Sequence, residues 1–272
     1  MSIKINNIIY KALIFDVDDT LIDTSKSYDE AIKKTVTHFT LSNVTDEPIN
    51  LVRTHGIAYG VNNDWNVTWI LIQLLKQFSI EQWEAVLTNQ VIDEINPQSI
   101  EYINIKEYFQ TIYLGKPPFN GQGLIDTAEQ KMYHDHFFPT IKQLGVKIAV
   151  VTSRLTDEAL HTLNNVNQLL GKFIDSEDVI ISMGSQNEQG QLIAEKPSPK
   201  PILECVNRLK AGLKACVYIG NSTSDYLAAR DAGVDFIQVG TSTIDRCNEP
   251  NGFNYLKLDS VNELIIDYCT KS

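Results

Sequence analysis

The sequence predicts an α/β protein in which an all-helical insertion interrupts a parallel-sheet core. Short apolar runs recur after residue 145 with helix-length spacers between them, and one more such run, Lys11–Phe15, lies near the amino terminus. Strands that alternate with helices form a mostly parallel sheet with helices on both faces. Between the first run and the later ones the periodicity is helical. We therefore expect the core to comprise residues 1–23 and 139–272, and the insertion to comprise residues 24–138.

The predicted strands of the core are short and apolar, which is typical of strands buried on both faces. They are Lys11–Phe15, Val146–Val151, Val179–Ile181, Ala215–Ile219 and Asp235–Val239. Two helix starts are also marked. Ser198 precedes Pro199, as an N-cap precedes a proline at the first helical position. Ser260 and Glu263 have the spacing of a capping box that opens the last helix.

The insertion carries helical signals of its own. Trp69–Leu75 is an apolar segment with helical periodicity, and Ser79–Gln82 has the pattern of another capping box. Gly115–Gly123 contains two prolines and several turn residues. We expect this segment to form a loop or the hinge by which the chain returns to the core.

Two carboxylates stand directly after the first predicted strand. Asp16 and Asp18 are two residues apart, so the alternation of side chains along an extended chain sends both to the same side. Two like charges this close need a cation, a shared proton or water beside them. Mg²⁺ with a phosphate next to it would satisfy that need. The alternative is a polar turn at the end of a strand, because aspartate is common in turns.

Three further segments place polar residues at strand ends or before a helix. They are Ala149–Arg154, which ends in hydroxyls, Glu195–Pro199, which contains a lysine, and Val217–Asp225, which runs from a strand into glycine, asparagine and aspartate. Parallel sheets bind their ligands at the carboxyl ends of the strands. Together with the Asp16 segment, these segments resemble, in order, the four motifs of the haloacid dehalogenase (HAD) superfamily, most of whose members are phosphatases. The resemblance covers the core and implies a Rossmann-like sheet with a helical cap inserted after the first motif, as in phosphoglycolate phosphatase-like members.

The resemblance implies a role for each motif. Asp16 would attack phosphorus and form an aspartyl-phosphate, and Asp18 would act as general acid and base. Thr152 would hold phosphate oxygens through its hydroxyl and the following backbone N–H groups, although Thr152 or Ser153 could instead cap the next helix. Lys196 would be the fixed cation that balances the charge of the phosphate in the transition state.

The resemblance also implies Mg²⁺ as the cofactor, with Asp16, Asp18, Asn221 and Asp225 as the metal site. Relatives usually carry an aspartate where this chain has Asn221. An amide oxygen can bind a hard cation but brings no charge, so we expect weaker metal binding. Asp225 lies one helical turn beyond Asn221, a spacing that suits a contact mediated by water.

Substrate recognition is expected from the cap and from the end of the second motif. In the cap, Arg53, Asn63 and Asp64 belong to polar segments that could bind a polar leaving group. The segment of Asn63 could equally be a helix N-cap followed by a core tryptophan. In the core, Ser153 and Arg154 follow Thr152 directly, and the fork-shaped guanidinium of the arginine suits a second anionic group of the substrate.

Composition limits the partners of the chain. Its 272 residues carry a net charge of −11, which argues against a nucleic-acid partner because nucleic acids bind basic faces. No apolar stretch approaches the length of a membrane span, and the first residues lack the features of a signal peptide. The four cysteines form no metal-binding spacing. We therefore expect a cytoplasmic enzyme that acts on a small phosphorylated metabolite, without a membrane or nucleic-acid partner; the oligomeric state stays open.

Three other functions remain as alternatives. A haloacid dehalogenase-like hydrolase gains support from Asn221, but dehalogenases usually lack the acid at the position of Asp18. A phosphomutase similar to β-phosphoglucomutase has the same core motifs. A catalytically weak protein that only binds phosphorylated ligands or a protein partner is disfavoured because all the motif residues are present, namely Asp16, Asp18, Thr152, Lys196 and Asp225.

Overall fold

The computed structural model describes residues 2–57, 61, 63–87 and 91–269, without the side chains of Ile57, Asp267 and Cys269. The chain divides into two compact units. Unit 1 comprises Met1–Asp23 and Gln130–Ser272, and unit 2 comprises Thr24–Glu129.

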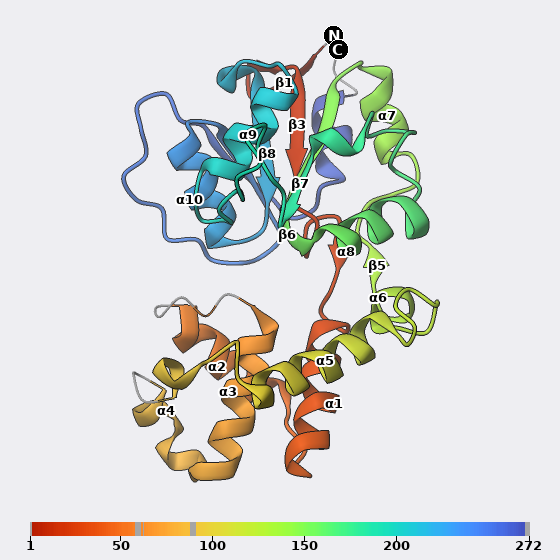
Figure 1. Cartoon of the computed structure of the whole chain (residues 1–272). Coiled ribbons are helices and arrows are strands. Elements are labelled where there is room, and N and C mark those ends of the chain that lie inside the picture. The colour runs from red at the N-terminus through yellow and green to blue at the C-terminus, as the bar shows by residue number, and fades with distance from the viewer. Residues whose placement is uncertain (1, 58–60, 62, 88–90, 270–272) are drawn as a thin grey trace. The chain divides into compact units, whose positions relative to one another are not determined.

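Unit 1 is built on a parallel sheet, which confirms the predicted α/β class. Within the described residues its strands, in spatial order, are β10 (Tyr255–Leu258), β9 (Asp235–Val239), β8 (Cys216–Gly220), β3 (Ala12–Phe15), β6 (Lys147–Leu155) and β7 (Ile180–Met183). The strand β3 lies between β8 and β6 (Figure 1). The segment that carries Asp16 therefore leaves the middle of the sheet.

Each of the predicted apolar runs forms a strand of this sheet, but its edge strand β10 and the amino-terminal hairpin were not predicted. The edge strand β10 is only partly buried and contains a lysine, so its sequence lacks the continuous apolar run of the central strands. The hairpin of β1 (Ile3–Ile5) and β2 (Ile8–Tyr10) turns at Asn6 and Asn7, whose φ angles are 47° and 68°. Positive φ at both positions is the geometry of the two-residue turns that join antiparallel strands, and asparagine tolerates it.

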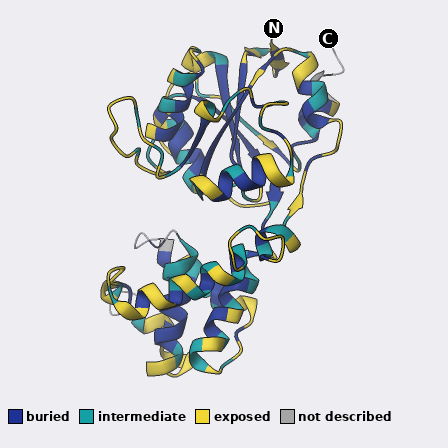
Figure 2. Cartoon of the chain, turned by 45° about the vertical axis from the view of Figure 1, so that its right-hand side comes forward, coloured by how far each residue is buried: buried dark blue, intermediate teal, exposed yellow. Residues whose placement is uncertain are grey.

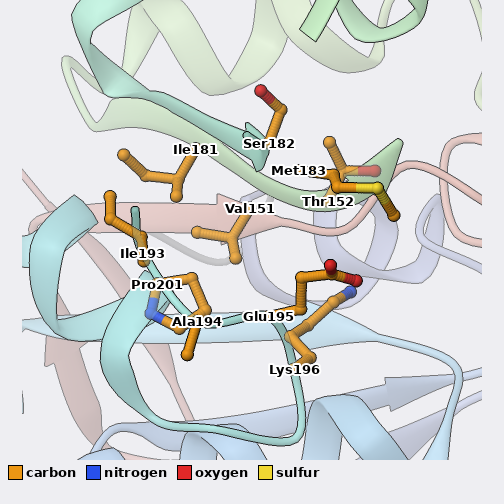
Figure 3. A pocket seen from close by; sticks show the side chains of 10 residues that line it. All are labelled: Val151, Thr152, Ile181, Ser182, Met183, Ile193, Ala194, Glu195, Lys196 and Pro201. Carbon is orange, nitrogen blue, oxygen red and sulfur yellow. The ribbon is translucent and has the colours of Figure 1, made fainter. Parts of the chain in front are cut away.

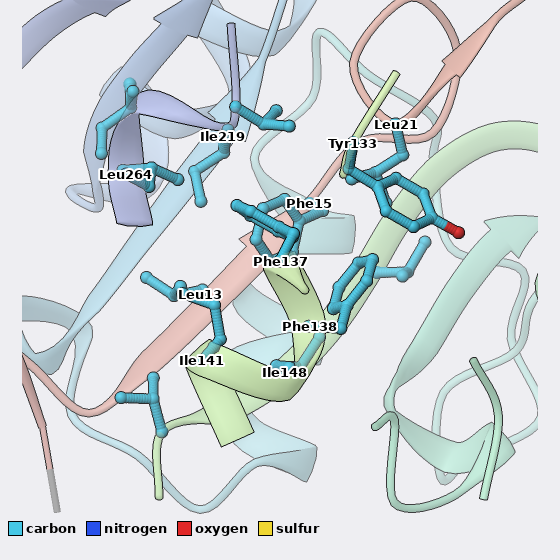
Figure 4. Packing of buried hydrophobic residues seen from close by; sticks show 14 of the residues in the cluster. Leu13, Phe15, Leu21, Tyr133, Phe137, Phe138, Ile141, Ile148, Ile219 and Leu264 are labelled. Carbon is cyan, nitrogen blue, oxygen red and sulfur yellow. The ribbon is translucent and has the colours of Figure 1, made fainter. Parts of the chain in front are cut away.

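Alternate residues of β3 pack into different cores on the two faces of the sheet. Phe15 belongs to one cluster of buried side chains, and Ala12 and Ile14 belong to the other. Figure 4 shows Phe15 against the rings of Phe137 and Phe138, whose centroids each lie 6.0 Å from its own. Burial on both faces explains why β3 reads as a continuous apolar run.

Helical segments connect the strands of unit 1, and one more follows the last strand. They are α7 (Phe137–Gln143), α8 (Thr156–Leu160), η3 (His161–Val166), η4 (Glu177–Val179), α9 (Lys200–Arg208), η5 (Leu213–Ala215), α10 (Thr223–Ala232) and η6 (Leu264–Cys269). Figure 2 shows the strands of the sheet as buried and the outward faces of the surrounding helices as exposed.

The two predicted helix starts of the core are present with small differences. The helix α9 begins at Lys200, one residue later than predicted, because Pro199 occupies the cap position and the Ser198 hydroxyl accepts a hydrogen bond from the Lys200 N–H at 3.3 Å. The carboxylate of Glu263 accepts from the Ser260 N–H at 2.9 Å, as the capping-box pattern predicts.

Unit 2 is helical and has a core of its own. Its segments are α1 (Tyr28–Thr40), α2 (Asp46–Ile57), α3 (Asp64–Gln77), η1 (Ile80–Gln82), α4 (Trp83–Val86), η2 (Ile92–Glu94), α5 (Ile100–Leu114) and α6 (Leu124–Thr127). Every residue from Val67 to Leu74 of α3 is buried, as expected of a helix that is apolar on all sides. The predicted capping box of Ser79 and Gln82 is present and opens η1. Among the described residues of both units, no helix has the length and apolar character needed to cross a bilayer.

The chain returns to unit 1 earlier than predicted. The strand β4 (Ile22–Asp23) pairs with β5 (Gln130–Lys131), so the return lies at residue 130 and not at residue 139. The reason is that Tyr133 and Phe137 already pack in the core of unit 1. The predicted loop Gly115–Gly123 joins α5 to α6 inside unit 2, so it is not the return hinge.

Candidate active site

The motif segments meet at the carboxyl edge of the central strands of unit 1. Phe15, the last residue of β3, pairs with Val150 of β6 and with Ile219 of β8. The next residue, Asp16, donates its backbone N–H to the carbonyl of Ile219 at 2.8 Å, which places it level with the end of β8 at Gly220. Segments far apart in the sequence thus bring their polar side chains to one edge of the sheet.

Lys196 joins two of these segments through its ammonium group. It donates to Oδ1 of Asp16 at 2.8 Å, to Oδ1 of Asp225 at 2.6 Å and to the hydroxyl of Tyr218 at 3.1 Å. These bonds use all the donors of the ammonium, and the side chain is only 4% exposed. Burial alone would lower the pKa of Lys196, but the charges of Asp16 and Asp225 raise it above its ordinary value. The lysine is therefore a fixed cation.

Asp225 anchors both Lys196 and the turn that follows β8. Its Oδ2 accepts from the Ser222 hydroxyl at 2.6 Å and from the backbone N–H groups of Asn221 and Ser222 at 3.2 and 3.0 Å. Ser222 accepts in return from the Asp225 N–H, which completes a capping box at the start of α10. Although burial opposes it, the charge of Lys196 together with these hydrogen bonds holds the pKa of Asp225 below its ordinary value.

These contacts account for the carboxylate of Asp225, whose place in the metal site stays a prediction. Oδ1 accepts from Lys196 and lies 3.0 Å from the Tyr218 hydroxyl, whose single proton can go either to this oxygen or to the Val151 carbonyl. Oδ2 accepts from three donors of the turn. Most of the lone pairs of this carboxylate are thus occupied by protein donors. Asp225 fixes the position of the lysine.

Asp16 is buried and shares its cation with another carboxylate. Its side chain is 7% exposed. Burial and the charge of Asp225 raise the pKa of Asp16 to about 8, against the lowering effect of Lys196. One ammonium between two carboxylates leaves a negative charge in an enclosed site. A further cation beside Asp16 would favour its ionised form.

The remaining oxygen atoms at this edge suit a hard divalent cation. Among the described residues, no protein group forms a hydrogen bond with Oδ2 of Asp16 or with the side-chain amide of Asn221. The two residues directly follow the neighbouring strands β3 and β8. The described residues contain no group of three or more histidine, cysteine, aspartate or glutamate side chains arranged for a metal. The donor set thus fits Mg²⁺ by ligand type but brings little charge.

Asp18 is held by Arg154. The Nε and Nη2 atoms of the arginine lie 2.7 and 2.6 Å from Oδ1 of Asp18, and its Nη1 lies 2.5 Å from the Thr162 hydroxyl. The arginine side chain is 0% exposed. The contact of Arg154 with a second anionic group of the substrate stays a prediction, and in this structure the partner of the guanidinium is Asp18. The guanidinium is enclosed and already pairs with a carboxylate, as a buried charge must.

Thr152 and Ser153 lie within a strand and not at a helix start. The strand β6 continues to Leu155, and α8 begins at Thr156 without a side-chain cap. The alternative in which one of these hydroxyls caps the helix is thus excluded. Thr152 is buried, and its hydroxyl accepts from the backbone N–H of Arg154 at 3.2 Å, whereas Ser153 is exposed.

A small cavity lies beside Thr152 and Lys196 (Figure 3). It is lined by Val151, Thr152, Ile181, Ser182, Met183, Ile193, Ala194, Glu195, Lys196 and Pro201. Its volume of about 10 Å³ is room for a single water molecule. A metabolite is too large for this space, so the cavity is not the substrate site.

The predicted substrate contacts of the cap are occupied by partners within unit 2. Arg53 donates from Nη1 to Asp29 at 2.6 Å and from Nη2 to Asp64 at 2.7 Å, which links α1, α2 and α3. Asn63 is the N-cap of α3 and accepts from the Asn66 N–H at 2.9 Å. This geometry supports the N-cap alternative. Arg53, Asn63 and Asp64 hold the helices of unit 2 together, and their contact with a substrate stays a prediction.

Three residues of the site were not found by sequence reasoning. The Tyr218 hydroxyl lies 2.9 Å from the Val151 carbonyl and so connects β8 to β6; a lone hydroxyl in an apolar strand was its only signal. Ser222 has capping-box spacing to the predicted residue Asp225, a signal that was present in the sequence. Thr162, which anchors the arginine beside Asp18, carries no local signal because its partner lies on another element.

Comparison with known families finds a match over most of the chain. A model described as haloacid dehalogenase-like hydrolase matches residues 10–233. This range contains all the motif residues described above.

Curated relatives are distant. Imidazoleglycerol-phosphate dehydratase from Phytophthora nicotianae is 26% identical over 227 residues, which are 82% of this chain and 42% of that protein. The chain therefore spans less than half the length of that relative. A protein provisionally described as the pyrophosphatase PpaX, from Caldanaerobacter subterraneus subsp. tengcongensis, is 23% identical over 236 residues, 86% of this chain and 83% of that protein.

Solved structures show the same architecture. Phosphatase Tt82 from Thermococcus thioreducens aligns with a TM-score of 0.58 at 20% identity, and the alignment covers 94% of this chain and 97% of that one. At this level of identity the likeness concerns the fold alone.

Proposed function

The chain belongs to the haloacid dehalogenase-like hydrolase family, and on that basis we propose that it is a Mg²⁺-dependent phosphomonoester hydrolase acting on a small phosphorylated metabolite. The observation that carries the proposal is the contact of Asp16 with the buried cation Lys196, at the sheet edge where Asp18 stands two residues further on. A nucleophilic carboxylate, a fixed cation and a second carboxylate for proton transfer are what this chemistry needs.

In the first step an oxygen of Asp16 attacks the phosphorus of the ester. A bond forms between that oxygen and phosphorus, and the bond from phosphorus to the ester oxygen breaks. The proton of the Asp18 carboxyl group passes to the leaving oxygen, which departs as an alcohol. The product on the protein is an aspartyl-phosphate.

In the second step water releases the phosphate. The water oxygen bonds to phosphorus, the bond from phosphorus to Asp16 breaks, and a water proton returns to Asp18. Inorganic phosphate leaves, and both carboxyl groups are back in their starting forms.

The other residues of the edge hold the phosphate and balance its charge. Lys196 already contacts the nucleophile, so its charge acts without reorganisation at the moment of reaction. Ser153 is exposed directly after Thr152, where its hydroxyl can donate to a phosphate oxygen. Thr152 lies closer to the interior and shapes this end of β6 through its bond with the backbone of Arg154.

Asp16 and Asn221 would hold Mg²⁺, since their oxygens lack protein partners among the described residues. When bound, the ion would add positive charge beside Asp16 and so favour its ionised form, which burial and the charge of Asp225 disfavour. The side chain of Asp18 is not assigned to the metal, because Arg154 binds one of its oxygens and proton transfer needs the other.

Two of the proteins similar to this chain have names that describe phosphate hydrolysis. A pyrophosphatase and a phosphatase are among the proteins that this chain resembles. Both names describe transfer of a phosphoryl group to water, which supports hydrolysis as the reaction class. The identity of the leaving group is a matter for experiment.

The test is a measurement of phosphate release by the purified full chain. The panel comprises sugar phosphates, phosphoglycolate and other small phosphomonoesters, together with pyrophosphate, each with Mg²⁺ or with EDTA. A haloalkanoic acid tests for dehalogenation through halide release. We expect Mg²⁺-dependent release of phosphate from at least one monoester, and the proposal fails if no phosphorylated compound is hydrolysed.

Two matched variants test the role of Asp16. Asp16→Asn removes the nucleophile and should abolish phosphate release. Asp19→Asn makes the same change three residues away, at a position whose φ of 51° asparagine also adopts, and should keep most of the activity. A folded Asp16→Asn protein that retains a tenth of wild-type activity would show that this aspartate is not the nucleophile.

A further inference from the structure

Arg154 contacts a single oxygen of the Asp18 carboxylate through two of its nitrogens. Two nitrogens of the guanidinium, Nε and Nη2, lie 2.7 and 2.6 Å from the same oxygen, Oδ1. A third nitrogen, Nη1, lies 2.5 Å from the hydroxyl of Thr162, which is itself buried. The planar group is thus held at both ends, by the carboxylate on one side and by η3 on the other.

The arginine is rigid and the aspartate is partly open. The side chain of Arg154 is 0% exposed, and that of Asp18 is 28% exposed. Arginine in the interior loses much rotamer freedom, and a planar fork locked by three bonds cannot follow a moving partner. The carboxylate of Asp18 therefore takes its orientation from the arginine.

The two oxygens of Asp18 are not equivalent. Both bonds from Arg154 end on Oδ1, and within the described part of the chain no donor reaches Oδ2. One oxygen is an anchor, and the other is left for a group from outside the protein.

We propose that Arg154 is a positioning residue for proton transfer: it fixes Asp18 by Oδ1 so that Oδ2 gives its proton to the leaving oxygen and later takes one from the attacking water. This inference rests on the proposed function. Thr162 contributes indirectly, because its hydroxyl fixes the guanidinium of Arg154.

The test compares two esters that differ in how much they need a proton. The phenolate of phenyl phosphate is a poor leaving group, and that of 4-nitrophenyl phosphate is a good one that departs without protonation. Positioned acid catalysis contributes about 10²–10⁴-fold when the leaving group needs it. The esters are compared by kcat/KM, which covers the first step but not the hydrolysis of the aspartyl-phosphate that both esters share. We expect Arg154→Met to lower kcat/KM about 10²-fold on phenyl phosphate and less than tenfold on 4-nitrophenyl phosphate, with Asp18→Asn as the reference for complete loss of the acid.

A double variant separates positioning from general damage. In the Asp18→Asn background, Arg154→Met should add little further loss, because residues that act through one group are not additive. A purely structural role would lower both esters by the same factor and would add to the loss from Asp18→Asn. Either result with an active wild-type enzyme overturns the inference and leaves the proposed function standing. A wild-type enzyme that hydrolyses neither ester nor any other phosphomonoester overturns both.

A milder pair covers the case in which Arg154→Met does not fold. Thr162→Val removes the hydroxyl that holds Nη1 and should shift the ratio of the two rates in the same direction by a few-fold, whereas Thr162→Ser keeps the hydroxyl and should restore the wild-type ratio. Equal ratios in the valine and serine variants would contradict the inference.

Discussion

Gly220 lets Asp225 approach the end of β8. A Cβ at this position would lie 2.6 Å from both Cγ and Oδ2 of Asp225, well inside van der Waals contact. The aspartate in turn holds Lys196. The glycine is therefore required by the packing around the fixed cation and not by an unusual backbone angle.

Gly220→Ala should consequently damage both stability and activity. The added methyl group must displace Asp225, and overpacking of this kind costs about 1–3 kcal/mol of the free energy of unfolding. Phosphate release should fall as Lys196 loses one anchor. Denaturant unfolding and the phosphate assay measure the two effects.

Gly212→Ala is the matched control, because a Cβ there would meet nothing within 4 Å and φ is −80°. It should change the free energy of unfolding by less than about 0.5 kcal/mol. If the two alanine variants behave alike, the contact with Asp225 is not what demands glycine.

In the proposed metal site, Asn221 contributes a neutral oxygen where a carboxylate would contribute a charged one. Asn221→Asp should lower the Mg²⁺ concentration needed for half-maximal activity by several-fold, because an anionic oxygen replaces a neutral one. The gain is limited by the negative charge already present on Asp16. Mg²⁺ titrations of activity measure the midpoint.

The control for this titration is Asn251→Asp, which adds the same charge at an exposed position. Its midpoint should equal that of the wild type. A midpoint that Asn221→Asp also leaves unchanged would mean that residue 221 does not touch the metal.

At the scale of elements, the start of α3 shows how a polar cluster serves the fold. Asn63 caps the helix, and Arg53 ties α2 to α1 and α3 through its two ion pairs. These helices surround the core of unit 2. Asn63 thus satisfies a free N–H group at the start of α3, and Arg53 pairs with carboxylates on the neighbouring helices.

Asn63→Ala should lower the free energy of unfolding by about 1 kcal/mol, because the helix loses its N-cap. Relative rates over the phosphate panel should stay as in the wild type. Asn50→Ala, at an exposed position inside α2, is the control and should cost no stability because alanine favours helix. A change in substrate preference without loss of stability would return Asn63 to the substrate site.

At the scale of the whole molecule, each unit has its own hydrophobic core. The core of unit 2 draws on residues between Ala31 and Ile125 and includes no residue of unit 1 among those described. Unit 2 is also one continuous stretch of chain, Thr24–Glu129. A continuous segment with a closed core has what a domain needs to fold by itself.

We therefore expect the fragment 24–129 to be helical and to unfold cooperatively. Circular dichroism during thermal unfolding measures this. The variant Leu71→Ala, at a fully buried position of α3, should lower the free energy of unfolding of the fragment by about 2–5 kcal/mol. A broad, non-cooperative transition in the unaltered fragment would contradict the prediction.

The sequence alone determined the class of the fold and the identity of the central strands. Apolar runs such as Ala215–Ile219 are local patterns, and they are typical of strands that a parallel sheet buries on both faces. The order of the motifs similarly indicated the family and predicted that Asp16, Asp18 and Lys196 belong to one active site. Local signals failed where a segment is half-buried, as at β10, and where a boundary depends on packing, as at Tyr133.

Only the tertiary structure decided which polar groups face each other. Arg154 and Asp18 are 136 positions apart, and nothing near either residue indicates that they pair. The same holds for Arg53, whose partners lie on two other helices. The physical reason is that a buried charge must find a counter-charge wherever the fold brings one, so its partner is selected by packing in three dimensions and not by spacing along the chain.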